Sequence, residues 1–155
     1  MSWPYDCEGP VPGKLTFLFL ALLLAAVRPV RAQRFMFTGV PDAEVLTFLG
    51  KLQKAVAAGD RAAVAGMVNY PLGVHRDAQH HTLVASATAL LKQYDAVFTP
   101  AIRRGILTET PANLPGARDG AGIKAGLVWI SGVCDRSRPA KGRLGVASVN
   151  LHGEQ

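Results

Sequence analysis

Residues 48–74, FLGKLQKAVAAGDRAAVAGMVNYPLGV, contain the strongest local folding signals in this chain. Apolar residues recur there every three or four positions, which predicts an amphipathic helix that begins near Pro41 and Asp42. Gly59 then suits the positive φ of a helix end, and Asp60 suits the cap of a following helix. The stretch therefore predicts two helices joined by a tight Gly-Asp turn.

The predicted first helix has one apolar face, so it needs a partner to pack against. That face consists of Val45, Phe48, Leu49, Leu52, Ala55 and Val56. The second helix is predicted over residues 61–68, and it must end before Pro71 because the residue before a proline avoids the α region. Residues 72–74 are expected to continue as an extended segment.

Two further helices are predicted after a polar loop and a short strand at residues 82–85. Ser86 can cap a helix that runs to Tyr94. Thr99 can cap the next helix, which is expected over residues 101–107 after a proline in its first turn.

Beyond Thr108 the sequence becomes rich in proline, glycine and β-branched residues. LVWISGVC (residues 127–134) and LGVASVNL (residues 144–151) predict two strands, and a third is expected around residues 121–125. Helices that precede strands indicate an α+β domain, in which N-terminal helices pack on one face of a curved, mainly antiparallel sheet. A chain of this length suits a single domain, here residues 33–155.

The order of these elements resembles the nuclear transport factor 2-like cone fold, and in particular a group of small exported bacterial proteins of that type. The resemblance rests on the quoted helix-turn-helix stretch, on LLKQYDAVFTPAIRRGIL (residues 90–107), and on the strands GLVWISGVC and VASVNL. It covers most of residues 42–151. It implies a fold more readily than an activity, because the exported group is largely uncharacterised.

The N-terminus predicts export. Lys14 precedes an uncharged and mostly apolar run at residues 15–27, and residues 30–32 have the side chains that signal peptidase accepts. The run is shorter than the roughly 20 residues that a bilayer-spanning helix needs. We therefore predict a signal peptide over residues 1–32 and a periplasmic or secreted protein, with an uncleaved signal anchor as the alternative. Removal of the leader leaves Cys134 as the single cysteine, so no intramolecular disulfide is expected.

The charge of the chain does not predict nucleic-acid binding. The 17 Lys and Arg residues exceed the 11 Asp and Glu residues, for a formal net charge of +6, but they are scattered along the sequence. Arg103 with Arg104 and the segment 136–143 are the local concentrations, and neither is interleaved with aromatic residues that could stack on bases. A solvated basic surface is the better interpretation.

His75, Asp77, His80 and His81 are the one cluster with metal-ligand residue types. Zinc needs three or four ligands that converge on one point, and the spacing of these residues matches neither a closed site nor one face of a helix. We therefore predict a solvated loop, no metal site and no cofactor. The three histidines are expected to be dispensable for folding.

Five residues are candidates for a ligand site. Tyr70, Tyr94 and Asp95 are singled out by the resemblance, because ketosteroid isomerase and SnoaL-like cyclases build sites from carboxylates and phenols inside the cone. Trp129 and Asn150 are singled out by strand alternation, which places apolar and polar side chains on one face. In residues 144–151 this alternation predicts Leu144, Val146, Ser148 and Asn150 on one face, and Ala147, Val149 and Leu151 on the other.

These patterns favour an exported, nonenzymatic domain that binds a small molecule or an envelope protein. The alternatives are a small isomerase, cyclase or hydrolase of the same fold, and a dimerising accessory module. Binding is expected in a cavity between the sheet and the helices of residues 42–68 and 86–107, with Trp129 or Tyr94 near its wall. The competing interpretation is that these side chains simply fill the core.

Overall fold

The computed structural model describes residues 34, 35, 38, 40–77, 79–117, 120–134 and 142–153. The predicted signal peptide lies outside these residues, and so does the side chain of Cys134. Within the described part of the chain, no helix has both the length and the hydropathy to cross a membrane.

As predicted, two helices are followed by two strands, then by further helices and finally by the C-terminal strands. The helices are α1 (Asp42–Ala57), α2 (Arg61–Gly66), α3 (Ala87–Lys92), α4 (Tyr94–Val97) and α5 (Pro100–Thr108). The strands are β1 (Val68–His75), β2 (His81–Val84), β3 (Gly116–Ala117), β4 (Gly120–Ile123), β5 (Val128–Cys134) and β6 (Gly142–Asn150). Two short 3-10 helices are η2 (Lys124–Gly126) and η3 (Leu151–Gly153).

The turn between α1 and α2 is confirmed in its details. Gly59 has a φ of 66°, and the side chain of Asp60 accepts a hydrogen bond from the backbone N–H of Ala63. The helix α2 nevertheless ends at Gly66, earlier than predicted, because Val68 already pairs with Val146 of β6. Strand pairing thus overrides a short helical pattern that local propensity alone would extend.

Strand β1 begins before Pro71 and runs through it, whereas the sequence predicted an extended segment only after the proline. The register between β1 and β6 shifts between Val68 and Gly73, so Pro71 lies in the irregular part of the pairing. A residue without a backbone N–H is tolerated there because no regular ladder bond needs its donor.

The predicted helix from Ser86 to Tyr94 is divided into α3 and α4 at Gln93. The side chains of Ser86 and Thr99 accept hydrogen bonds from the backbone N–H groups of Ala89 and Ile102, so both predicted caps are confirmed. The break at Gln93 starts a new helical turn, in which Tyr94 and Phe98 stack with their ring centroids 5.1 Å apart.

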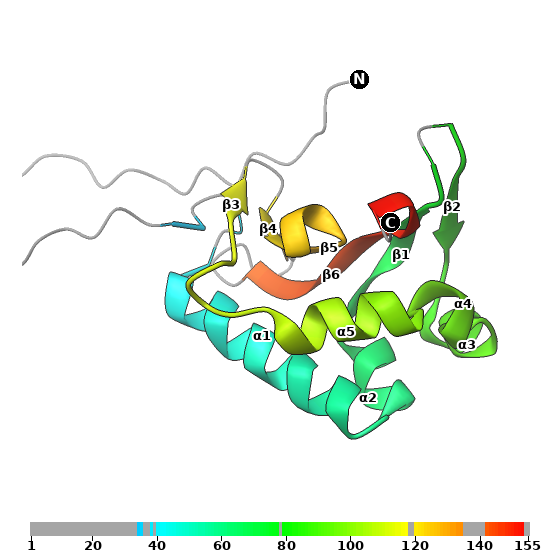
Figure 1. Cartoon of the computed structure of the whole chain (residues 1–155), viewed down its shortest axis with the longest axis horizontal. Helices are drawn as coiled ribbons and strands as arrows, with labels where there is room; N and C mark the ends of the chain where they lie inside the picture. Colours follow the sequence, from blue (N-terminus) through cyan, green and yellow to red (C-terminus); the bar gives the residue numbers. More distant parts are fainter. Residues whose placement is uncertain are drawn as a thin grey trace, which may run out of the picture.

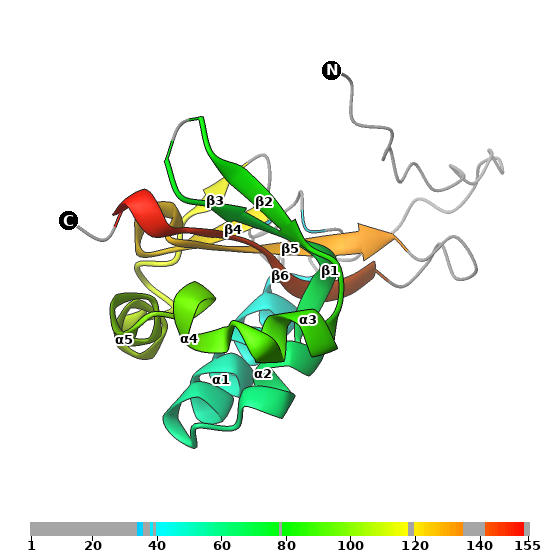
Figure 2. The same cartoon turned by 90° about the vertical axis from the view of Figure 1, so that its right-hand side faces the viewer.

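The strands form one six-stranded sheet in the order β2-β1-β6-β5-β4-β3. Strands β1 and β6 run parallel, and the other neighbouring pairs are antiparallel. Figure 1 shows the helices gathered below the strands, and Figure 2 shows α1 to α5 on one face of the curved sheet. The α+β class and the packing of helices on one face of a curved sheet are thus confirmed.

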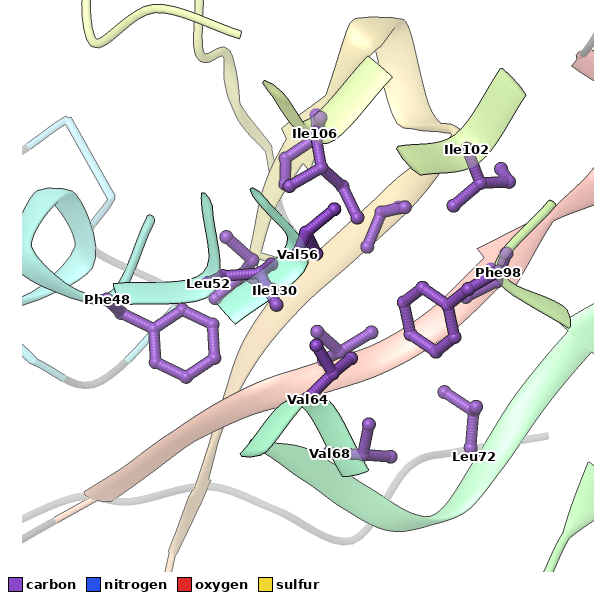
Figure 3. Packing of buried hydrophobic residues seen from close by; sticks show 14 of the residues in the cluster. Phe48, Leu52, Val56, Val64, Val68, Leu72, Phe98, Ile102, Ile106 and Ile130 are labelled. Atoms are coloured by element: carbon purple, nitrogen blue, oxygen red, sulfur yellow. The ribbon is translucent and has the colours of Figure 1, made fainter. Parts of the chain in front are cut away.

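The hydrophobic core fills the space between the helices and the sheet. Figure 3 shows side chains from both layers meeting there, including Leu52 of α1, Val64 of α2, Ile106 of α5 and Ile130 of β5. Each of these four is fully buried. This packing supports the interpretation of a filled core over that of a ligand cavity in the same place.

A β-bulge in β6 overturns the predicted alternation of that strand. Trp129 pairs with Ser148 and Ile130 pairs with Val146, so Ala147 is the additional residue. Val146 and Val149 are both fully buried on the side of the helices, although the strict alternation placed them on opposite faces. A bulge adds one residue to one strand, which reverses the facing of every later residue.

Candidate functional site

Asp95 lies at the centre of a surface ion-pair cluster that joins three helices. Its carboxylate lies 2.9 Å from Arg61 Nη2 of α2 and 2.9 Å from Arg103 Nη1 of α5. The Arg61 guanidinium also lies over the ring of Tyr94, 5.2 Å from the ring centroid. The three charged side chains therefore connect α2, α4 and α5 at the surface.

A hollow of about 310 Å³ adjoins this cluster. It is lined by Val56, Ala57, Gly59, Arg61, Tyr94, Asp95 and Arg103. Two of the five predicted site residues, Tyr94 and Asp95, are thus brought together, but at the outer surface of the helices rather than between helices and sheet. Burial raises the pKa of the Tyr94 phenol, and the positive charges of Arg103 and Arg61 oppose that rise.

The environment of Asp95 is unsuited to general-base chemistry. The hydrogen bond from Arg103 is the main cause that lowers the pKa of Asp95, and the charge of Arg61 adds to it. The side chain is 57% exposed. A catalytic base near neutral pH needs the opposite, namely a buried carboxylate with a raised pKa. The cluster is better explained as a link between helices.

Tyr70 lies apart from this cluster. Its hydroxyl donates a hydrogen bond to the backbone carbonyl of Ala65, 2.9 Å away, which ties β1 to the end of α2. Burial raises the pKa of the Tyr70 phenol, and the charge of Arg143 opposes the rise. The donor that an enolate-stabilising phenol would need is therefore already engaged with the backbone.

We expect Asp95→Asn to remove a small, pH-dependent part of the stability. Because the folded-state pKa of Asp95 is lowered, its contribution is present above its ordinary pKa and is lost as the pH falls through the folded pKa. Urea unfolding across the acid range should show the wild-type advantage only on the higher-pH side. A double-mutant cycle with Arg103→Gln isolates the pair, and purely additive losses would contradict the coupling.

Trp129 lies on the other face of the sheet, opposite to the helices. Val128 and Ile130 point into the core and are fully buried, so the alternation of β5 places Trp129 on the opposite side, where it is partly buried. A Cβ added at Gly122 would lie 3.4 Å from the Trp129 ring, and one added at Gly126 would lie 3.3 Å from it. The indole therefore rests on a platform of two glycines.

We call this side of the sheet the open face, because none of the helices α1 to α5 lies on it (Figure 2). The strand positions that point to it include Gly73, His75, His81, Leu83, Gly122, Trp129, Ser131, Val133, Arg143, Ser148 and Asn150. Leu83 is 66% exposed and Val133 is 47% exposed, so two large apolar side chains meet solvent there. The open face thus combines exposed apolar groups with small polar ones.

The turn η2 beside Trp129 is strained and is held from two sides. Lys124 and Ala125 have φ values of 47° and 55°, which side chains other than glycine rarely adopt. The buried carboxylate of Glu109 accepts a hydrogen bond from the backbone N–H of Lys124, and the side-chain amide of Asn150 donates to the carbonyl of Gly126. Asn150, a predicted ligand residue, therefore has a positioning role for the turn under the indole.

Sequence reasoning selected Trp129 as a site residue but missed Leu83, an exposed apolar side chain on the same face. Leu83 escaped notice because a four-residue strand carries too little periodicity to reveal which face is buried. One signal was available, since the strand sequences contain no Asp or Glu at all. A sheet with so few charged residues and with helices on one side leaves a second face with little to keep it solvated.

The prediction of a solvated loop holds for Asp77 and His80, which are exposed, whereas His75 and His81 lie in β1 and β2 and His75 is half-buried. His80 Nδ1 lies 2.7 Å from the carboxylate of Asp77, and both side chains are largely exposed. Among the described residues, no three His, Cys, Asp or Glu side chains are placed to hold a metal ion together.

Comparisons with protein-family models, with curated proteins and with solved structures found no match for this chain. The similarity to the nuclear transport factor 2-like fold therefore stays a prediction, and the function rests on the geometry of this chain alone.

Proposed function

We propose that this protein is a nonenzymatic binding domain that binds another protein through its open face. The observation that carries the proposal is the partly buried Trp129, with exposed Leu83 and Val133 on the same face, where no helix from α1 to α5 covers them. Together with the predicted signal peptide, this surface points to a partner in the cell envelope or outside the cell.

Trp129 has the properties of an interface anchor. Tryptophan is among the residues that contribute most to binding energy, and it does so best when its orientation is fixed before binding. The platform of Gly122 and Gly126 supports one side of the ring, and the strained turn at Lys124 and Ala125 is held against it. Backbone strain that the surrounding structure maintains often marks a functional site.

The charges of the sheet favour a neutral or acidic partner. Arg143 is the one residue of the six described strands that is charged at neutral pH, and His75 and His81 can add positive charge. A partner surface with apolar groups and carboxylates would complement this face, whereas a second copy would bring charge of the same sign. The alternative of a dimerising module is therefore less well supported.

The remaining alternatives have weaker support. A small-molecule site between helices and sheet competes with the filled core, and an isomerase-like site competes with the exposed, arginine-paired Asp95. A small apolar ligand on the open face would use the same tryptophan, so an experiment that detects a protein partner directly is needed to distinguish the two.

Site-specific photo-crosslinking tests the proposal. A photoreactive residue placed at Leu83 or at Val133 should give an adduct with one discrete protein in the native host. Leu107, which is 45% exposed on α5, is the matched control on the helical side. Trp129→Ala should lower the adduct yield from both open-face positions by more than about tenfold, because loss of an anchor costs about 2 kcal/mol or more.

The control outcomes are specific. Circular dichroism must show that Trp129→Ala remains folded under the crosslinking conditions. Equal adducts from Leu107, or adducts that persist in Trp129→Ala, would contradict the open face as the binding surface. An adduct of twice the mass of this chain would contradict the neutral or acidic partner and establish the dimer instead.

A further inference from the structure

All four histidines of the chain gather at one end of the sheet. His75 ends β1, His80 and His81 lie at the start of β2, and His152 lies in η3. The backbone hydrogen bond from Gln79 is the main cause that lowers the pKa of Asp77 in the β1–β2 loop, and the charge of His152 adds a smaller part, so His152 lies within electrostatic reach of that loop. Residues about 70 positions apart in sequence thus share one small region.

His75 and His81 form a stacked pair across this hairpin. They are directly opposite in the antiparallel register, and their ring centroids lie 6.1 Å apart with an angle of 30° between the ring planes. The backbone N–H of Arg76 donates to the carbonyl of His80, so Arg76 and His80 form a hydrogen-bonded pair. The adjacent pair, His75 and His81, is therefore a non-hydrogen-bonded pair. Side chains approach most closely in pairs of that kind.

Among the described residues around this stack, few can neutralise charge on it. Asn150 is paired with His75 on the side of β6 and is neutral, and Arg76 and His152 add positive charge. Asp77 is the one carboxylate described in the loop, and it is engaged with the His80 ring and with the backbone N–H groups of Gln79 and His80. Two protonated rings in the stack would therefore repel each other, and no carboxylate in the described part of the chain is a direct counter-ion to them.

We propose that the His75–His81 stack makes the β1–β2 hairpin an acid-sensitive element. Histidine gains a proton in the range between about pH 8 and about pH 5, so neutral rings stack at the upper end and like charges face each other at the lower end. Like charges directly opposite on paired strands destabilise the pairing. Acidification then weakens the pairing of β1 with β2.

Strand β2 is the element that this change affects most. It has four residues, lies at the edge of the sheet, and has β1 as its one neighbour in the strand order. The core of the domain is anchored elsewhere, through β1, β6 and β5, so opening can remain local. This sensitivity is a property of the isolated chain and does not depend on the partner proposed above.

Hydrogen exchange of the full chain tests the proposal. The backbone amides of Thr82 and Val84 face β1 in the hydrogen-bonded pairs. After correction for intrinsic exchange rates, their protection reports the stability of the pairing between β1 and β2. Their protection should fall about two- to fivefold between about pH 8 and about pH 5, the range that like-charge pairing predicts. Amides shared by β5 and β6 should keep their protection and serve as the internal reference.

Two variants decide the cause. His75→Gln with His81→Gln should abolish the fall in protection at Thr82 and Val84, since glutamine cannot be protonated. His80→Gln, which lies outside the stack, should keep it. A fall of the same size in the double variant, no fall in the wild type, or a parallel fall at β5 and β6 would each overturn the proposal.

Discussion

Replacing Phe98 with alanine is expected to lower the free energy of unfolding by about 3–5 kcal/mol. Phe98 follows α4, is fully buried and stacks on Tyr94, and Figure 3 shows its ring in the layer between the helices and the sheet. Removal of the ring from a filled core leaves a cavity that the neighbours close only in part. Urea unfolding monitored by circular dichroism measures the loss.

The same variant distinguishes a filled core from a ligand-binding cone. Leu91→Ala on α3 is the matched control, because Leu91 is 41% exposed and should cost less than about 1 kcal/mol. If Phe98→Ala lowered the free energy of unfolding by as little as Leu91→Ala does, the filled core would be contradicted. It would restore the cavity that the sequence predicted for this region.

Gly120→Ala is the second change with a large expected effect, above about 3 kcal/mol, because it combines backbone strain with a steric clash. Gly120 starts β4 with a φ of 131°, a conformation that other residues rarely adopt. An added Cβ would also lie 2.1 Å from the carbonyl oxygen of Ile130 on the neighbouring strand. The loss should appear as a lower urea midpoint or as failure to accumulate folded protein.

Gly50→Ala provides the control for a glycine without such constraints. Gly50 lies within α1, and a Cβ there would meet no atom within 4 Å. This change should stabilise the protein by about 0.5–1 kcal/mol, since alanine favours a helix more than glycine does. Equal effects of the two substitutions would show that the close approach of β4 to β5 is not essential.

The local features of the fold could be read from the sequence because they depend on neighbouring residues. Gly59 and Asp60 define the α1–α2 turn, and Ser86 and Thr99 cap their helices, each through contacts within three or four positions. The apolar stripe of α1 was predicted for the same reason, and its five largest members are buried.

The features that escaped prediction depend on residues distant in sequence. The bulge at Ala147 exists because β6 must match β5 on one side and β1 on the other. The end of α2 is decided by the pairing of Val68 with Val146. The lack of Asp and Glu in the strands is a hint of an open face, but its location could not be predicted, since it follows from the placement of α1 to α5 on the opposite side (Figure 2).

The position of β6 between β1 and β5 has a consequence during synthesis on the ribosome. Until residues 142–150 emerge, β1 with β2 and β5 with β4 and β3 are two separate groups of strands with nothing between them. The contacts of β6 with β1 also close a long loop, which slows folding. The nascent chain must therefore remain without its complete sheet for most of its translation. Such a delay would suit the export that the N-terminal sequence predicts, because an exported polypeptide is threaded through a membrane before it folds.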